Sequence, residues 1–188
     1  MAVEKGYGNI VARLMDNSAQ VNVADDRGRT PLHVAVEKGY GNIAARLMDN
    51  SAQVNVADDR GRTPLHEAAE KGCDLIAWLL LEKNADVNFR DAFGRTPLFW
   101  AIDGGYEDLV SLLVDQDAEI NIRDEFGRTP LSSAVRYGNE KMVRLLLAKN
   151  ADADFKDGSG QAPLELAIQK QDESMVQLIL SKKGYSRA

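Results

Sequence analysis

The chain has 188 residues, of which 44% are hydrophobic and 28% charged, and its 23 basic and 29 acidic side chains leave a net charge of −6. This composition is that of a globular chain with a sizeable core. Its acidic balance argues against nucleic-acid binding, which needs a basic surface. The longest apolar run, Leu75–Leu81, is too short to cross a bilayer. A single cysteine, Cys73, excludes an internal disulfide. We therefore expect an intracellular protein, cytoplasmic or nuclear, that binds neither membranes nor nucleic acid.

A short motif recurs along the chain with a constant period of 33 residues. Thr-Pro-Leu-His begins at Thr30 and Thr63, and weaker forms of the motif begin at Thr96, Thr129 and Ala162. A glycine two residues before each motif and an aspartate five residues before it keep the same period. So many positions in phase indicate one structural unit repeated along the chain.

Each unit is predicted to hold two helices and a turn-rich link. Threonine is a good N-cap and proline suits the first helical position, so each motif begins a short helix. In one unit this helix runs from Pro64 to Lys71 and ends at Gly72. The second helix carries apolar residues at helical spacing, and the link at 84–94 leads to the next unit. One such unit cannot bury its own apolar face, so neighbouring units must stack.

The period, the Thr-Pro-Leu-His opening and the link Ala85-Asp86-Val87-Asn88 resemble the ankyrin repeat over essentially the whole chain. The resemblance implies an all-α repeat solenoid of stacked helix-turn-helix units with β-hairpin-like finger loops. It also implies a concave face, built from the fingers and the first helices, that binds other proteins. We expect a single ankyrin-repeat domain over 1–188, with a partial repeat at 1–24, full repeats at 25–57, 58–90, 91–123 and 124–156, and a C-terminal capping repeat at 157–188.

Three departures from the family pattern carry expectations. The glycine after each second helix is replaced by another residue, so we expect those helix ends to close less tightly. The replacements are Ser18, Ser51, Asn84, Asp117 and Asn150. The last unit lacks the threonine cap and the mid-repeat glycine, and its second helix is polar enough to face solvent as a cap.

The N-terminal units are nearly identical to each other. Residues 2–33 and 35–66 differ only at Val11 and Ala44, which indicates a recent duplication or a repeat copied during construction. The chain also begins inside a unit, so we expect it to come from a longer array and its first helix to fray. A monomer is expected, with end-to-end stacking through the uncapped N-terminal repeat as the route to an oligomer.

A search for chemistry finds no catalytic, cofactor-binding or metal site in the sequence. His33 and His66 share one motif position, and no cluster with metal-ligand spacing accompanies them. The family resemblance implies a structural histidine that bonds backbone groups near the preceding loop. Cys73 has no partner in a redox motif, and no phosphate-binding loop or nucleophile elbow occurs. The protein is therefore predicted not to be an enzyme.

An arginine precedes the threonine of four motifs, at Arg29, Arg62, Arg95 and Arg128. Stacked repeats would align these side chains into a stripe along the fingers. The stripe could dock acidic or phosphorylated segments, because guanidinium groups bind carboxylates and phosphates bidentately. Since the chain is acidic, we favour the alternative that the nearby loop aspartates neutralise the stripe.

Aromatic residues give the candidate partner-binding surface. Phe93 and Phe126 occupy finger tips, and Trp100 lies on a first helix. We predict that these rings and Tyr137 converge on the concave face, because exposed aromatics beside arginine are typical of interface hot spots. The alternative is that the rings pack on one another. The full candidate set is Phe93, Arg95, Phe99, Trp100, Asp103, Phe126, Arg128, Ser133, Arg136 and Tyr137.

The resemblance also implies a modification. An asparaginyl hydroxylase can hydroxylate the asparagine of the Asp-Val-Asn link in ankyrin repeats. Asn88 and Asn121 match the spacing of that pattern, so both are candidate hydroxylation sites.

The predicted function is therefore a non-enzymatic module that binds a segment of another protein on its concave face. Side chains held by the stack lose little freedom on binding, which favours affinity. Two alternatives stay open. One is a structural spacer or an engineered repeat scaffold without a private partner, favoured by the near-identical first units. The other is a regulatory fragment of a larger multidomain protein.

Overall fold

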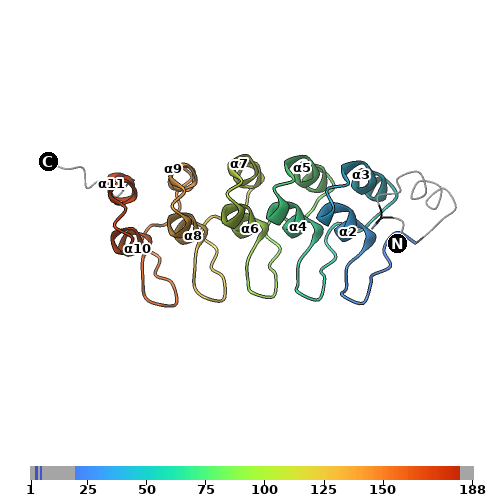
Figure 1. Ribbon diagram of the computed structural model, residues 1–188, viewed down its shortest axis with the longest axis horizontal. Helices are drawn as coiled ribbons and strands as arrows, with labels where there is room; N and C mark the ends of the chain where they lie inside the picture. The colour runs from blue at the N-terminus through green and yellow to red at the C-terminus, as the bar shows by residue number, and fades with distance from the viewer. Residues whose placement is uncertain (1–2, 4, 6–19, 183–188) are drawn as a thin grey trace.

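The computed structural model describes residues 3, 5 and 20–182, and within them it places ten helices in two parallel layers (Figure 1). The layer next to the finger loops holds the first helix of each unit, and the other layer holds the second. The first helices are α2 (Pro31–Glu37), α4 (Pro64–Lys71), α6 (Pro97–Gly104), α8 (Pro130–Tyr137) and α10 (Pro163–Gln169). The second helices are α3 (Gly41–Asp49), α5 (Asp74–Glu82), α7 (Glu107–Asp115), α9 (Glu140–Ala148) and α11 (Glu173–Lys182).

The first helices begin where the motif predicts. Thr63 has extended backbone angles and Pro64 opens α4, which ends at the left-handed Gly72 (φ 64°) as expected. The His66 Nδ1 accepts a hydrogen bond from the backbone N–H of Thr63 at 3.1 Å. In α8, Ser132 replaces the histidine, and its Oγ accepts from the Thr129 N–H at 2.9 Å.

The repeated histidines are structural, as predicted, and they also join neighbouring units. The Nε2 of His33 donates to the carbonyl oxygen of Arg62 at 3.0 Å, and that of His66 donates to Arg95 at 3.1 Å. A carbonyl only accepts, so Nε2 carries the proton and Nδ1 is free to accept from the cap. The Nε2 bond therefore reaches the loop of the following unit. It adds to the bond near the preceding loop that the resemblance implied.

The second helices close tightly without the family's glycine, so the expectation of looser ends is wrong in the described units. Ser51 and Asn84 adopt left-handed angles, with φ of 66° and 63°. The amide of Ala52 donates to Leu47 and that of Ala85 to Leu80, both at 2.9 Å. Backbone hydrogen bonds thus hold the left-handed turn even where the residue is not glycine. The left-handed conformation of these residues strains the backbone. Ser18 lies outside the described residues.

The core runs through both layers without interruption. The motif leucines Leu32, Leu65, Leu98 and Leu131 are fully buried, and the second helices add apolar residues from the other side. An asparagine in each link spaces adjacent units. For example, Asn88 accepts from the Glu119 N–H at 2.7 Å and donates to the Asp117 carbonyl at 3.2 Å.

The fingers project from the layer of first helices and lie side by side (Figure 1). Within the described part of the chain they contain no strand, but backbone bonds link one finger tip to the next. The N–H of Ala92 donates to Arg60 at 2.9 Å, and that of Glu125 donates to Phe93 at 3.0 Å. We call the surface formed by the fingers and the exposed sides of the first helices the inner face.

No helix among the described residues is long and apolar enough to span a membrane. The expected fraying of the first helix, and end-to-end stacking through the first repeat, fall mostly on residues outside the described part of the chain.

Candidate functional site

The bases of the first four fingers are each held by an ion pair between the motif arginine and the aspartate four residues earlier. These pairs are Arg29–Asp25 at 2.8 Å, Arg62–Asp58 at 3.6 Å, Arg95–Asp91 at 3.3 Å and Arg128–Asp124 at 2.6 Å. The hydrogen bond from Arg29 lowers the pKa of Asp25 to about 2. The prediction that loop aspartates neutralise the arginine stripe is confirmed.

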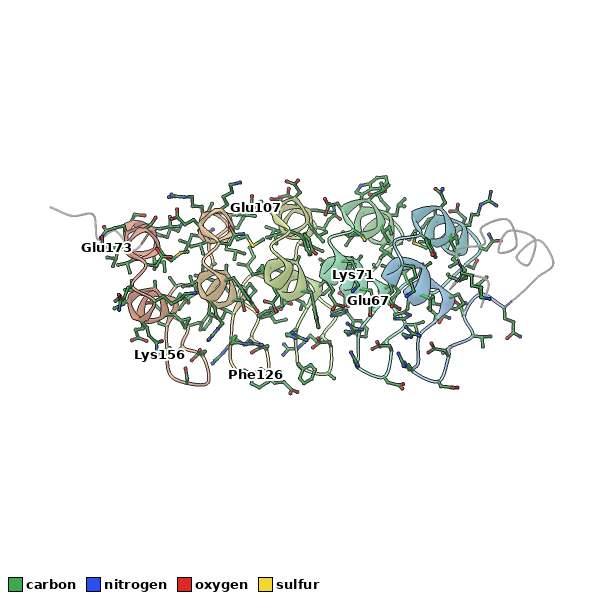
Figure 2. The ribbon with its side chains drawn as sticks, in the orientation of Figure 1. Glu67, Lys71, Glu107, Phe126, Lys156 and Glu173 are labelled. Carbon is green, nitrogen blue, oxygen red and sulfur yellow. The ribbon has the colours of Figure 1, made fainter. Side chains whose placement is uncertain are left out.

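In the second unit, Arg62 is enclosed by acidic groups. It donates to Glu70 at 2.8 Å, contacts Glu67 and lies near Asp58. Glu67 lies on α4 beside the finger loops (Figure 2), and it is only 3% exposed. Burial raises the pKa of Glu67, and the charge of Arg62 opposes that shift. Three carboxylates therefore hold this guanidinium.

In the third unit, Trp100 stands where the second unit has Glu67. Its indole Nε1–H donates to the Oδ2 of Asp91 at 3.1 Å. The guanidinium of Arg95 stacks on the Trp100 ring, with Cζ 3.8 Å from the ring centroid, and lies 5.4 Å from the centroid of Phe93. Asp103 lies 3.9 Å from Arg95, beyond hydrogen-bonding distance, and burial raises its pKa. Arg95 thus lies against two rings beside its ion pair with Asp91, whereas Arg62 lies farther from the Trp100 ring, at 5.5 Å, and contacts three carboxylates.

An open groove of about 440 Å³ lies between the fingers of the second and third units. We call it the Trp100 groove. It is lined by Arg60, Arg62, Asp91, Phe93, Arg95 and Trp100, together with Asp59 and Ala92. A second open cleft of about 440 Å³ lies one unit earlier and is lined by charged side chains, including Arg27, Glu37 and Lys71. Of these two clefts, the Trp100 groove is the one in which apolar and charged side chains meet.

Comparison with known families places the chain. A family model of ankyrin repeats, in three copies, matches residues 1–91, 58–124, 75–157 and 116–186. The chain belongs to the ankyrin repeat family. No curated protein matches it as a relative. Ankyrin repeats are generally protein–protein interaction modules and are typically non-enzymatic. The predicted family and the all-α solenoid are confirmed.

The ankyrin fold leaves three of the predicted aromatics exposed. Phe93 is 47% exposed, Phe126 57% and Tyr137 55%. Trp100 is half-buried and packs against the core, so it is less exposed than we expected. These four side chains keep their place as candidates.

Two predicted contact residues are wrong, because the structure buries them. Phe99 is 1% exposed, since it occupies the inward-facing position that His33 and His66 hold in earlier units. Ser133 is 2% exposed, since its short side chain does not extend to the surface that Trp100 reaches from the same position of its repeat. Neither side chain can offer contact area to a partner in this conformation.

The remaining candidates do not form one continuous cluster. Phe126 lies over Arg128, with Cζ 5.0 Å from the ring centroid, at the end of its finger away from the helices (Figure 2). Arg136 pairs with Asp157 at 3.4 Å, and Tyr137 ends α8. No hydrogen bond, ion pair or ring contact in the described part of the chain joins these side chains to the Trp100 groove. The predicted convergence of the aromatics is therefore confined to Phe93 and Trp100, with Arg95 between them.

The predicted contact set lacks five residues that line the groove, namely Asp59, Arg60, Arg62, Asp91 and Ala92, and two of them matter most here. Asp91 accepts the indole hydrogen bond that orients Trp100, and Arg60 lines the groove from the tip of the second finger. The signal for Arg60 was present, because it shares the phase of Phe93. The role of Asp91 depends on the side-chain direction of Trp100, which the period does not specify.

Outside the inner face, Trp78 is 45% exposed on α5, in the layer away from the fingers. Asn88 is half-buried and Asn121 is exposed, and both amides bridge adjacent units. Their hydroxylation stays a prediction. Within the described residues no cluster of histidine, cysteine and acidic side chains could hold a metal.

Proposed function

We propose that this protein binds a segment of another protein on the inner face of its ankyrin stack, centred on the third and fourth units. The observation that carries the proposal is the pair of exposed rings at the finger tips, Phe93 and Phe126, where earlier fingers carry Arg27 and Arg60. Large apolar side chains at the ends of projecting loops gain contact area only when a partner covers them.

The surrounding charges support a specific contact. Phe93 adjoins Trp100 and Arg95 in one groove, and aromatic residues with arginine are the residue types enriched among interface hot spots. On the next finger, Phe126 adjoins Arg128, and Arg136 and Tyr137 extend the surface along α8. Asp103 supplies the acidic member of the set beside Arg95.

The mechanism is preorganisation. Backbone hydrogen bonds between finger tips and the indole bond to Asp91 fix these side chains before a partner arrives. Binding therefore orders few additional groups, and a small number of aromatic and charged contacts suffices for a stable complex.

Affinity capture from a lysate of the source organism tests the proposal. The bait is the wild-type chain, and the test variant is Phe93→Ala/Phe126→Ala/Tyr137→Ala, whose side chains are all about half-exposed. The matched control is Leu75→Ala/Trp78→Ala, which removes exposed apolar area from α5 in the other layer. We expect a protein that the wild type and the control retain and the test variant loses, with unchanged helical content.

Two results would count against the inner face. Retention by the test variant but not by the α5 control would move the site to the outer layer. Absence of any specific protein on the wild-type bait would favour the structural spacer, to which the near-identity of residues 2–33 and 35–66 already points.

A further inference from the structure

The four motif arginines differ in how fully their hydrogen-bonding groups are used. Arg29 and Arg128 donate to their aspartates at 3.0 Å and 2.7 Å through Nε, and Arg62 donates to Glu70 at 2.8 Å. The Nε groups of both Arg62 and Arg95 are buried without a partner. Among the described residues, however, Arg95 is the one motif arginine whose side chain makes no hydrogen bond at all, so it has most to gain from a ligand.

Trp100 competes with Arg95 for the aspartate of the third unit. Its indole N–H occupies the Oδ2 of Asp91, the atom whose counterpart in the fourth unit accepts from Arg128. The other carboxylate oxygen of Asp91 accepts the backbone N–H groups of Phe93 and Arg95, at 2.8 Å and 2.9 Å. Asp91 therefore already accepts three hydrogen bonds, and its ion pair with Arg95 at 3.3 Å adds no hydrogen bond.

The same ring also fixes the direction of Arg95. The guanidinium carbon lies over the ring at 3.8 Å from its centroid, and a guanidinium held against an aromatic face can still donate to a carboxylate through its edge. The Arg95 side chain is 14% exposed, so such a bond would form with little competition from water. Exposed Phe93 and Arg60 border the same groove.

We propose that the Trp100 groove recognises an acidic, extended segment of the partner protein, in which an aspartate or glutamate carboxylate binds Arg95 and an adjoining apolar side chain covers Phe93. The inference rests on the proposed function and specifies the chemistry of the partner. Charge complementarity supports it, because three arginines and two aspartates line the groove. A free inorganic anion would leave the Phe93 ring uncovered, so a peptide fits the surface better.

The test begins with a displayed library of random peptides selected on the wild-type chain. We expect the selected peptides to share an acidic residue beside an aliphatic or aromatic one. A consensus peptide and its Glu→Gln form are then measured by calorimetry against wild type, Arg95→Gln and Arg29→Gln. Arg29 is the matched control, since it occupies the same repeat position outside the Trp100 groove and already bonds Asp25.

The expected result is a coupled loss. Arg95→Gln or the peptide change alone weakens binding by about tenfold or more, as for a hydrogen bond to a charged group. The two changes together cost no more than one, because both remove the same contact. Arg29→Gln leaves the affinity unchanged.

Failure of this inference is distinguishable from failure of the proposed function. Peptides that lose affinity on Phe93→Ala but show no acidic preference, or no coupling to Arg95, would overturn the acidic recognition and keep the inner face. Peptides insensitive to both Phe93→Ala and Arg95→Gln, or no selected peptide at all, would count against both.

A second variant tests the positioning role of Trp100. Trp100→Phe keeps an aromatic ring but removes the indole donor, so Oδ2 of Asp91 becomes available to Arg95. We expect the affinity ratio between the glutamate and glutamine peptides to shrink severalfold. An unchanged ratio would show that the indole bond does not control Arg95.

Discussion

The second and third units have the same backbone frame and opposite side-chain arrangements at the base of the finger. In the second unit, Arg62 lies among Asp58, Glu67 and Glu70. In the third, Arg95 lies against the rings of Phe93 and Trp100 and makes no side-chain hydrogen bond among the described residues. One unit surrounds its arginine with three carboxylates, and the other pairs its arginine with Asp91 but leaves its side-chain N–H groups without a hydrogen bond in the described part of the chain.

The difference arises largely at one position of the repeat, occupied by Glu67 in the second unit and by Trp100 in the third. A carboxylate there adds an acceptor to the cluster, whereas an indole adds a donor and competes for Asp91. A stack of ankyrin repeats can therefore keep its framework constant and change binding chemistry unit by unit. The two units should therefore differ in how much their mutation changes stability and binding.

The largest expected effect is on stability, from loss of Arg62. Arg62→Met leaves the Glu67 carboxylate buried without its cation, which should lower the free energy of unfolding by about 3 kcal/mol at pH 7. Arg95→Met should cost about 1 kcal/mol, because Asp91 keeps its indole and backbone donors. Urea unfolding followed by far-ultraviolet circular dichroism measures both.

Adding Glu67→Gln to Arg62→Met is the internal control. It removes the buried charge, so part of the lost stability should return. Equal losses for Arg62→Met and Arg95→Met, or no recovery in the double variant, would contradict the comparison between the two units.

The next effect is a dependence of stability on pH. It arises from His66 in the second unit and has no counterpart at Phe99, which holds the same repeat position in the third. Burial lowers the pKa of His66 to about 4 from its ordinary 6.5. Between these values the unfolded chain binds a proton that the folded chain does not, so stability falls as the pH drops. The expected loss from pH 6.5 to 4 is about 3 kcal/mol from this residue. Burial also lowers the pKa of His33, which acts in the same direction.

His66→Ser checks this origin, since Ser132 caps the corresponding helix in the fourth unit. Free energies of unfolding measured across that pH range should show a clearly shallower slope for the variant. Glu67 acts in the opposite direction, because burial raises its pKa and its folded form gains a proton first. A slope identical to that of the wild type would rule out His66 as a main source of acid sensitivity.

The sequence predicts what depends on period and local propensity. The start of α4 at Pro64, its end at Gly72 and the pairing of Arg95 with Asp91 follow from residue type and spacing. The burial of Phe99 does not, because it depends on which face of a short helix meets the neighbouring units. The indole bond of Trp100 likewise depends on a rotamer that only the packed neighbours select.

A smaller gain is expected at the ends of the second helices, where Asn84 and Asp117 hold φ angles of 63° and 62°. Asp117→Gly should raise the free energy of unfolding by about 1 kcal/mol, because it relieves left-handed strain and removes a negative charge from a helix C-terminus. Asn84→Gly should gain only about 0.3 kcal/mol, since asparagine tolerates this conformation. Asp117→Asn separates the charge from the strain, and a greater gain at Asn84 would contradict the argument.

The smallest effect on stability is expected at the finger tips, where the second unit carries Arg60 and the third Phe93. Phe93→Arg copies one tip onto the other and should change the free energy of unfolding by at most about 0.5 kcal/mol, as for an exposed residue. Arg95 keeps its place on the Trp100 ring, which is nearer to it than Phe93. Peptide binding in the Trp100 groove should nevertheless be lost, because the apolar contact becomes a like charge beside Arg95. A thermal midpoint that falls together with the affinity would instead make Phe93 a structural residue of its finger.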